Sequence, residues 1–177
     1  SAAGRIATSF SVGGKPLTPG RREALKGAVP DAGAVLEVAT ADAAEFSNAT
    51  LEELDALIVQ LADLHESASG HVIAGAYKEA LQKAEGCFQG WQTLIETLRN
   101  LGILLKLDFS AIQVEGKPVN DRFVRVKDAF QKFTEAFGKQ DVVRLGDVIQ
   151  YELKPLLSEW RSVIGALRRP AGGGAAS

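Results

Sequence analysis

Two short stretches of the sequence pair glycine with lysine, a combination that holds phosphate groups in many nucleotide-binding loops. The first is SVGGKPL (residues 11–17) and the second is QVEGKPV (residues 113–119), and their matching positions lie 102 residues apart. A P-loop requires G-x-x-x-x-G-K followed by Ser or Thr. Here Ser9 and Ala111 stand where the first glycine should be, and proline follows each lysine. The spacing therefore argues against nucleotide binding at either copy.

A structural joint explains the repeat better than a binding loop does. In each copy a strand ends at valine, glycine supplies a turn, and Lys-Pro stiffens the exit. Thr18 and Asn120 follow two residues after each proline, and both are residue types that cap helix N termini. We therefore predict that each copy leads from a strand through a turn into a capped helix. A binding role for Lys15 and Lys117 is left open.

The residues that usually carry metal or nucleophilic chemistry lack the necessary spacing. Helical bundles bind metal ions through Glu and E-x-x-H motifs, but the chain has only His65 and His71, each with alanine three residues before it. We expect His65 near a helix end at the bundle surface and His71 at a helix start. Cys87 lies on an apolar helical face, so we expect a core thiol rather than a nucleophile. We predict no catalytic, cofactor-binding or metal-binding residue and no enzymatic activity.

The segment YELKPLLSEW (residues 151–160) is the remaining candidate site. A proline inside a helix removes one backbone donor and kinks the helix. A kinked helix that presents Tyr151, Glu152 and Trp160 beside Pro155 could line an interaction groove. The alternative is that Tyr151 and Trp160 pack in the core while Glu152 is exposed.

Composition and charge restrict the possible partners and compartments. The 177 residues are 46% apolar and 24% charged, which is typical of one globular domain, or of one domain with a small appendage. A net charge of −2 gives no basic excess for nucleic acid, and one cysteine excludes an intramolecular disulfide. No apolar run approaches the ~18 residues of a membrane span. We expect a cytoplasmic protein, and leave open a removed targeting segment because the sequence has no initiator methionine.

Apolar periodicity predicts four amphipathic helices in an up-down bundle. The first begins at the T-x-x-E capping box of Thr50 and precedes a short link over residues 67–70. The second is one long helix over about residues 70–106. The third follows Asn120 and stops at Gly138, and the fourth is capped by Asp141 and kinked at Pro155. The apolar seam of the long helix comprises Ile73, Tyr77, Ala80, Ala84, Cys87, Trp91, Leu94, Leu98, Leu101 and Leu105.

Three further patterns concern the packing of these helices. A second apolar stripe on the long helix (Leu81, Phe88, Ile95) widens its buried face. Gly86 and Gly90 within that helix predict a bend or the close approach of another helix. The first helix carries five acidic residues and no basic one, whereas the third has a net charge of +2. We therefore expect the first and third helices to be neighbours, although exposed ion pairs contribute little.

The non-helical segments predict a small sheet. Strand-like patterns cover Arg5–Val12, residues 33–40 and Asp108–Val114, and a short helix capped by Thr18 lies between the first two. The predicted fold is α+β, mostly α: an up-down four-helix bundle with a small, about three-stranded, sheet from the N-terminal region and the segment before the third helix. The expected divisions are a strand-helix-strand region over 1–47, a bundle over 48–169 that includes strand 108–115, and a disordered tail over 170–177.

The layout resembles uncharacterised bacterial proteins in which strands ending in a V-x-G-x turn alternate with long amphipathic helices, and in which the final helix carries a segment like DVIQYELKPLLSEW (residues 147–160). The resemblance spans most of the chain and implies no activity and no site residue. The leading hypothesis is a non-enzymatic interaction or adaptor/chaperone-like module that binds a protein partner or itself; by analogy, bacterial secretion and flagellar export chaperones are small acidic helical bundles. The alternatives are a small-molecule-binding bundle with a pocket between its helices or near Pro155, and an enzyme of unrecognised type.

Overall fold

The computed structural model describes residues 5–12, 15–16 and 35–168. The chain divides into two compact units, Ser1–Ala49 and Thr50–Ser177. The expected helix after Thr18 and the expected tail over 170–177 lie outside the described residues. The described strands of the first unit are β1 (Arg5–Val12), β2 (Lys15–Pro16) and β3 (Leu36–Asp42), in the antiparallel order β2-β1-β3. The predicted strand Arg5–Val12 is confirmed, and the second predicted strand begins at Leu36 rather than at residue 33.

The third predicted strand does not join this sheet, so that part of the prediction is wrong. Only Gln113–Val114 (β4) is extended, and it pairs with Lys117–Pro118 (β5) in a separate two-stranded hairpin. The reason is the turn between them: Glu115 and Gly116 both have positive φ, at 56° and 74°. Two central residues with positive φ produce a tight hairpin turn, which returns the strand onto itself.

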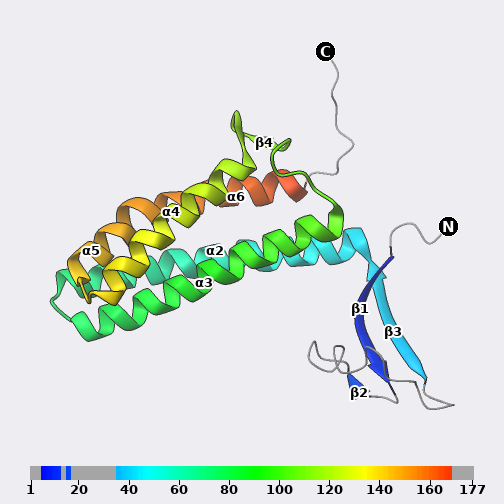
Figure 1. The fold of residues 1–177 in the computed structure, drawn as a ribbon, viewed down its shortest axis with the longest axis horizontal. Coiled ribbons are helices and arrows are strands. Elements are labelled where there is room, and N and C mark those ends of the chain that lie inside the picture. The colour runs from blue at the N-terminus through cyan, green and yellow to red at the C-terminus, as the bar shows by residue number, and fades with distance from the viewer. Residues whose placement is uncertain (1–4, 13–14, 17–34, 169–177) are drawn as a thin grey trace. The chain divides into compact units, whose positions relative to one another are not determined.

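Four long helical segments, the first of which begins in the first unit, make up the helical bundle and confirm the predicted up-down arrangement. They are α2 (Ala43–Ile73), α3 (Tyr77–Leu105), α4 (Val119–Gly138) and a continuous fourth helix. The fourth helix consists of α5 (Val142–Asp147), the π-helical segment η1 (Val148–Leu153) and α6 (Lys154–Arg168). Successive helices run in opposite directions, so the α2–α3 and α4–α5 turns lie at the same end of the bundle (Figure 1).

The boundaries of the first two helices differ from the prediction. Asp42 Oδ1 accepts hydrogen bonds from the backbone N–H groups of Ala44 (2.9 Å) and Glu45 (3.1 Å), so α2 starts at Ala43 and not at the Thr50 capping box. The link expected at 67–70 is helical instead. The chain turns at residues 74–76, where Gly75 has a φ of 71° that suits glycine.

The boundaries of the last two helices are closer to expectation. Pro118 precedes α4, and Asn120 lies inside the first helical turn rather than capping it. The predicted stop at Gly138 is confirmed. The predicted cap at Asp141 is also confirmed, because its Oδ1 accepts a hydrogen bond from Arg144 N at 3.0 Å.

The fourth helix widens immediately before Pro155. The N–H of Lys154 donates to the carbonyl of Ile149, five residues back, as in a π-helix. Proline has no N–H, and in an α-helix its ring crowds the carbonyl four residues earlier, here that of Tyr151. The disturbance expected at Pro155 therefore takes the form of the six-residue η1 segment.

The helices enclose one continuous apolar core with Trp91 and Trp160 fully buried. The close-approach interpretation holds for Gly90, since a Cβ atom there would lie 2.7 Å from Leu61 Cδ2. At Gly86 the nearest atom, on Leu64, would lie 3.8 Å away, which is ordinary contact. Leu61 and Leu64 of α2 thus pack against α3, which runs antiparallel to α2.

The prediction that the first and third helices are neighbours is wrong. The acidic residues of α2 pair with the fourth helix, Glu66 with Lys154 at 2.6 Å and Asp55 with Arg161 at 3.1 Å. Helix α4 also pairs with the fourth helix, for example Lys132 with Glu152 at 2.7 Å. Alternate helices of an up-down bundle occupy opposite corners, so α2 and α4 both adjoin the fourth helix.

Gly102 gives the first testable prediction. A Cβ atom at Gly102 would lie 2.4 Å from Phe109 Cε2, a ring that also packs 5.2 Å from Phe123. We expect Gly102→Ala to lower the free energy of unfolding by about 1–3 kcal/mol, because the ring must shift. Urea unfolding measures this, with Gly70→Ala as the control because nothing lies within 4 Å of that position. Gly70→Ala should be neutral or stabilising; equal losses in both variants would contradict the packing described here.

Candidate functional site

The structure separates the four residues of the predicted groove. Tyr151 is 73% exposed and Pro155 is exposed, whereas Glu152 is half-buried. Trp160 is fully buried, with its ring 4.8 Å from that of Phe123 in an edge-on contact. Trp160 therefore belongs to the core, as the alternative interpretation had it, while Tyr151 faces solvent, contrary to that interpretation.

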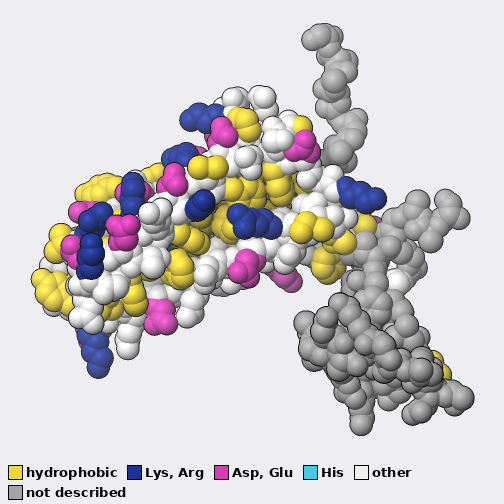
Figure 2. All heavy atoms as spheres, viewed as in Figure 1, with side chains coloured by type: hydrophobic (Ala, Val, Ile, Leu, Met, Phe, Trp, Pro, Cys, Tyr) yellow, Lys and Arg dark blue, Asp and Glu magenta, His cyan; other side chains and the backbone are white. Residues whose placement is uncertain are grey.

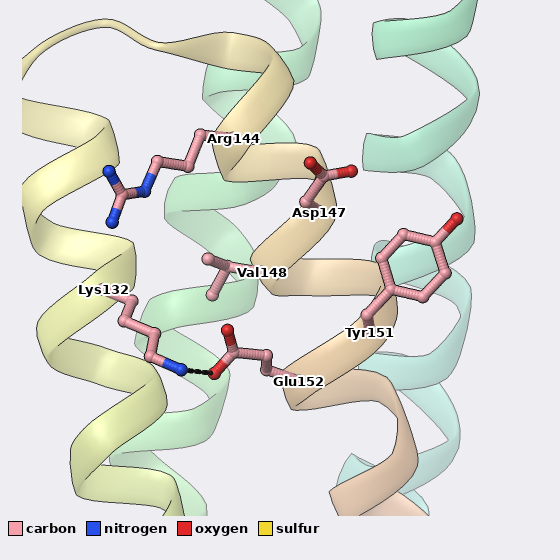
Figure 3. Close-up of a pocket in the computed structure, with 6 residues that line it drawn as sticks. All are labelled: Lys132, Arg144, Asp147, Val148, Tyr151 and Glu152. Atoms are coloured by element: carbon pink, nitrogen blue, oxygen red, sulfur yellow. Dashed lines mark hydrogen bonds and ion pairs between the residues drawn. The ribbon is translucent and has the colours of Figure 1, made fainter.

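Tyr151 and Glu152 line a surface hollow of about 450 Å³ between α4 and the fourth helix (Figure 3). Its other lining residues are Lys132, Arg144, Asp147 and Val148. Lys132 binds Glu152 at 2.7 Å, and Arg144 lies 3.9 Å from Glu135. Both cations of the hollow therefore already have carboxylate partners, and the apolar part of the lining consists of Val148 and the ring of Tyr151.

A row of aromatic rings follows the junction of α3 and α4. Phe88 of α3 lies 4.8 Å from Phe130 and 5.2 Å from Phe133, and Phe133 lies 5.9 Å from Phe137. Phe133 is buried, Phe88 and Phe130 are partly exposed, and Phe137 is 37% exposed. Apolar side chains are visible at the surface along this junction (Figure 2). We define the α3–α4 seam as Tyr77, Leu81, Phe88, Gln92 and Arg99 of α3 with Lys127, Phe130 and Phe137 of α4.

The apolar part of the seam continues to the end of the bundle that carries the two short turns. Tyr77, at the start of α3, is 53% exposed, and Ile73 and Val143 beside the turns are also exposed. A Cβ atom on Gly146 would lie 3.3 Å from Val72 Cγ2, so the last turn of α2 packs against α5. The exposed apolar side chains at this end therefore come from two turns that lie next to each other.

The other half of the seam is cationic. The Arg99 guanidinium lies 5.4 Å from the centroid of the Phe123 ring, and Lys127 lies three residues before Phe130 on the same face of α4. Among the residues that the structure describes, neither Arg99 nor Lys127 forms an ion pair. The seam thus changes from aromatic to unpaired positive charge along its length.

His65 is a buried residue that the sequence prediction misplaced. It is fully buried in the middle of α2, not at the surface near a helix end. Its Nε2 accepts a hydrogen bond from Trp91 Nε1 at 3.0 Å, while its buried Nδ1 has no partner among the described residues. Burial lowers the pKa of His65 to about 4, and the nearby charge of Lys154 acts in the same direction. The sequence did carry one signal of this burial: His65 lies four residues after Leu61 and three before Ala68, which is the spacing of an apolar helical face.

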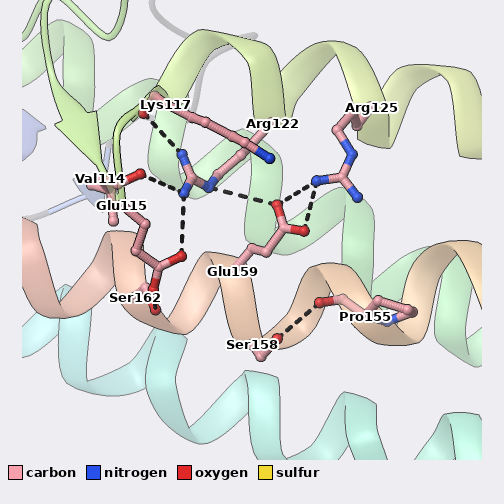
Figure 4. Close-up of polar contacts among 9 residues, drawn as sticks. All are labelled: Val114, Glu115, Lys117, Arg122, Arg125, Pro155, Ser158, Glu159 and Ser162. Carbon is pink, nitrogen blue, oxygen red and sulfur yellow. Dashed lines mark hydrogen bonds and ion pairs between the residues drawn. The ribbon is translucent and has the colours of Figure 1, made fainter.

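Arg122 is the second buried polar residue that the sequence did not reveal. It is 2% exposed, and its guanidinium donates to the carbonyls of Val114 (2.8 Å) and Lys117 (3.2 Å) (Figure 4). Glu115 and Glu159 lie 3.7 Å from it on opposite sides. Arg122 therefore ties the hairpin of the second V-x-G-K-P copy to α4 and α6.

In both copies of the repeat the strand pairs with the Lys-Pro that follows it, in the same antiparallel register. Val12 pairs with Lys15 in the first copy and Val114 with Lys117 in the second, both antiparallel. The prediction of a strand and a glycine turn is therefore confirmed for the second copy, but the chain then enters a short returning strand before the helix. The second copy is therefore a structural joint, whereas the helix expected after the first copy lies outside the described residues.

Cys87 is a core thiol, as predicted. It is fully buried, and burial raises its pKa to about 12, so the thiol stays protonated at neutral pH. Within the described ranges, no group of three or more His, Cys, Asp or Glu side chains is placed to hold a metal ion. In the same ranges, no helix is long and apolar enough to cross a membrane.

Comparison with known proteins gives one match. A family model with the description "Domain of unknown function (DUF8042)" matches residues 49–163. The matched region contains the β4–β5 hairpin that leads into α4 and nearly all of the helical bundle. It excludes the β2-β1-β3 sheet. Neither the curated proteins nor the solved structures contain a significant match to the chain.

Proposed function

The chain belongs to the DUF8042 family, and for the bundle that this family model covers we propose a non-enzymatic role in binding another protein through the α3–α4 seam. The single observation that supports the proposal is the row of rings from Phe88 to Phe137, in which Phe88, Phe130 and Phe137 are partly exposed. Isolated apolar side chains are common on protein surfaces, but contiguous patches are typical of interaction sites. Aromatic side chains are also over-represented among the residues that dominate binding energy.

The hollow beside Tyr151 supports small-molecule binding less well. Its volume lies within the usual range for ligand sites, but such sites are lined mainly by hydrophobic side chains. Four of its six lining residues carry a charge at neutral pH, namely Lys132, Arg144, Asp147 and Glu152. Small-molecule binding is therefore the second candidate, favoured only by the size and position of this hollow.

The remaining parts of the proposal concern partner class and location. A net charge of −2 supports a protein partner rather than nucleic acid. A single buried thiol needs no oxidising compartment, which supports a cytoplasmic location. Protein binding through the α3–α4 seam includes the case in which the partner is a second copy of the chain.

Substitution of Phe137 tests the proposed surface. We expect Phe137→Asp to weaken partner binding about 30-fold, because an anchoring aromatic contributes ~2 kcal/mol or more to an interface. Val59→Asp is the matched control, since Val59 is an exposed apolar residue on α2. The partner would be purified from lysate of cells that make the protein naturally, identified by mass spectrometry, and titrated by biolayer interferometry. Light scattering would detect self-association.

Two results would count against the proposed function. One is equal binding by both Asp variants, which would move the interface away from the seam. The other is a strict monomer by light scattering together with no recovered partner. Circular dichroism of both variants would establish that neither substitution unfolds the bundle.

A further inference from the structure

We propose that the occupant of the α3–α4 seam is a single amphipathic helix of another protein, with apolar side chains over the rings and acidic side chains beside Arg99 and Lys127. This inference rests on the proposed function and specifies its partner. It follows from the spacing of the seam residues, from the unpaired charge at one end of the seam, and from the symmetry that a second copy would require.

The spacing of the seam residues suits a helix. Leu81 and Phe88 are seven residues apart on α3, and Phe130 and Phe137 are seven apart on α4. Seven residues are two helical turns, or about 10.5 Å. A helix lying along the junction of two antiparallel helices can place its own apolar residues at this repeat, as in coiled coils and helix-in-groove complexes. An extended peptide, with about 3.3 Å per residue, has no matching repeat.

The charge of the seam indicates where the acidic side chains of that helix would lie. Arg99 lies 11 residues after Phe88 on α3, and Lys127 lies on the facing part of α4, beyond the rings. Neither cation forms an ion pair among the described residues, whereas Arg125 and Lys132 on the fourth-helix side of α4 both do. Acidic side chains on the partner would therefore find two cations without competing carboxylates at this half of the seam.

A second copy of the chain fits the seam poorly. Symmetric dimers bring the same surface of both copies together. Antiparallel seams centred on a two-fold axis would place the rings of one copy against Arg99 and Lys127 of the other, where the ring faces attract the cations but leave them without carboxylate partners. Parallel seams would place the cations of both copies opposite each other, and an axis through the rings alone would leave the cations outside the contact. An acidic helix from a different protein can place apolar side chains over the rings and carboxylates beside the cations at the same time.

Site-specific photocrosslinking tests this proposal. A benzoylphenylalanine at Gln92, an exposed seam position between Phe88 and Arg99, would be compared with one at Gln60 on the exposed face of α2. Both proteins would be irradiated in lysate of cells that make the protein naturally, and the crosslinked peptides would be sequenced. We expect position 92, but not position 60, to capture a segment with apolar residues at three- and four-residue spacing and a net negative charge. Capture of a basic segment, a non-amphipathic segment or the chain itself would overturn the proposal.

Charge reversal gives an independent measurement on the purified partner. We expect Arg99→Glu to weaken binding at least 10-fold and to reduce its dependence on salt concentration. Lys83→Glu is the matched control, because Lys83 lies three residues before Gly86 on the face of α3 nearest α2. Equal effects of the two substitutions, or tighter binding by Arg99→Glu, would contradict an acidic occupant.

The experiments distinguish a failure of the helix proposal from a failure of the proposed function. If a partner copurifies and Phe137→Asp releases it, but position 92 captures no acidic amphipathic segment, the helix proposal is wrong and the interaction function stands. If no partner copurifies and the protein is monomeric, the proposed function fails and the helix proposal fails with it.

Discussion

The free energy of unfolding is expected to decrease by about 3 kcal/mol through His65 alone as the pH falls from 7 to below 4. The pKa of His65 is about 4 in the folded protein, against an ordinary value of 6.5. Between these values the unfolded chain binds a proton that the folded chain does not. The stabilising contribution is therefore complete above pH 6.5, decreases as the pH falls towards 4, and is lost below 4.

The physical cause is the position of the imidazole in the core. Its Nε2 accepts the Trp91 hydrogen bond, so the neutral ring carries its proton on Nδ1. Protonation would add a donor on Nε2, break that bond and create a charge in a fully buried position. The positive charge of Lys154 further opposes protonation.

Urea unfolding at several pH values between 4 and 7 measures the effect. His65→Leu removes the titrating group, so its stability should vary less with pH than that of the wild type, although it leaves the indole of Trp91 without its acceptor. His71→Leu is the control for the loss of a histidine elsewhere in the chain. Carboxylates contribute equally to all three proteins and cancel in the comparison. Parallel pH profiles for wild type and His65→Leu would show that His65 is not responsible.

Arg122→Ala is expected to destabilise the protein by about 3 kcal/mol or more, the cost of breaking a buried charged cluster. The substitution leaves the Val114 and Lys117 carbonyls of the hairpin without their donor. Arg122→Lys should restore only part of the loss, because one ammonium group lacks the fork of a guanidinium. Chemical denaturation measures both variants.

Arg125 provides the matched control for Arg122. It binds the same carboxylate, that of Glu159, but its side chain is 47% exposed. Arg125→Ala should therefore cost less than about 1 kcal/mol, as exposed ion pairs do. If the two alanine variants were equally stable, the hairpin would not depend on the buried guanidinium.

Much of the fold was predictable because it rests on local signals. Alternation of apolar and polar residues located β1, and the three- and four-residue spacing located the helical faces. The boundaries were less predictable, because Asp42 and Thr50 are both good helix caps and the residues between them are compatible with helix. Tertiary pairing was not predictable either. The third strand folds back on itself at Glu115–Gly116, and only the structure distinguishes that hairpin from addition to the N-terminal sheet.

The candidate site was only partly predictable for related reasons. The stripe containing Leu81 and Phe88 was visible in the sequence but was expected to be buried, and the partial exposure of the α4 phenylalanines was not predicted. Their ring edges reach solvent because the large rings stack between α3 and α4. The burial of Arg122 had no sequence signal, since the residue type favours the surface.

Chemical-shift mapping would show whether the α3–α4 seam is the protein-binding surface. The ¹⁵N-labelled protein would be titrated with its purified partner, and amide shifts would be followed along all four helices. A protein-binding seam predicts that the largest changes occur at residues 77–99 of α3 and 127–137 of α4. Changes confined to α2, or to the hollow between Arg144 and Glu152, would contradict it.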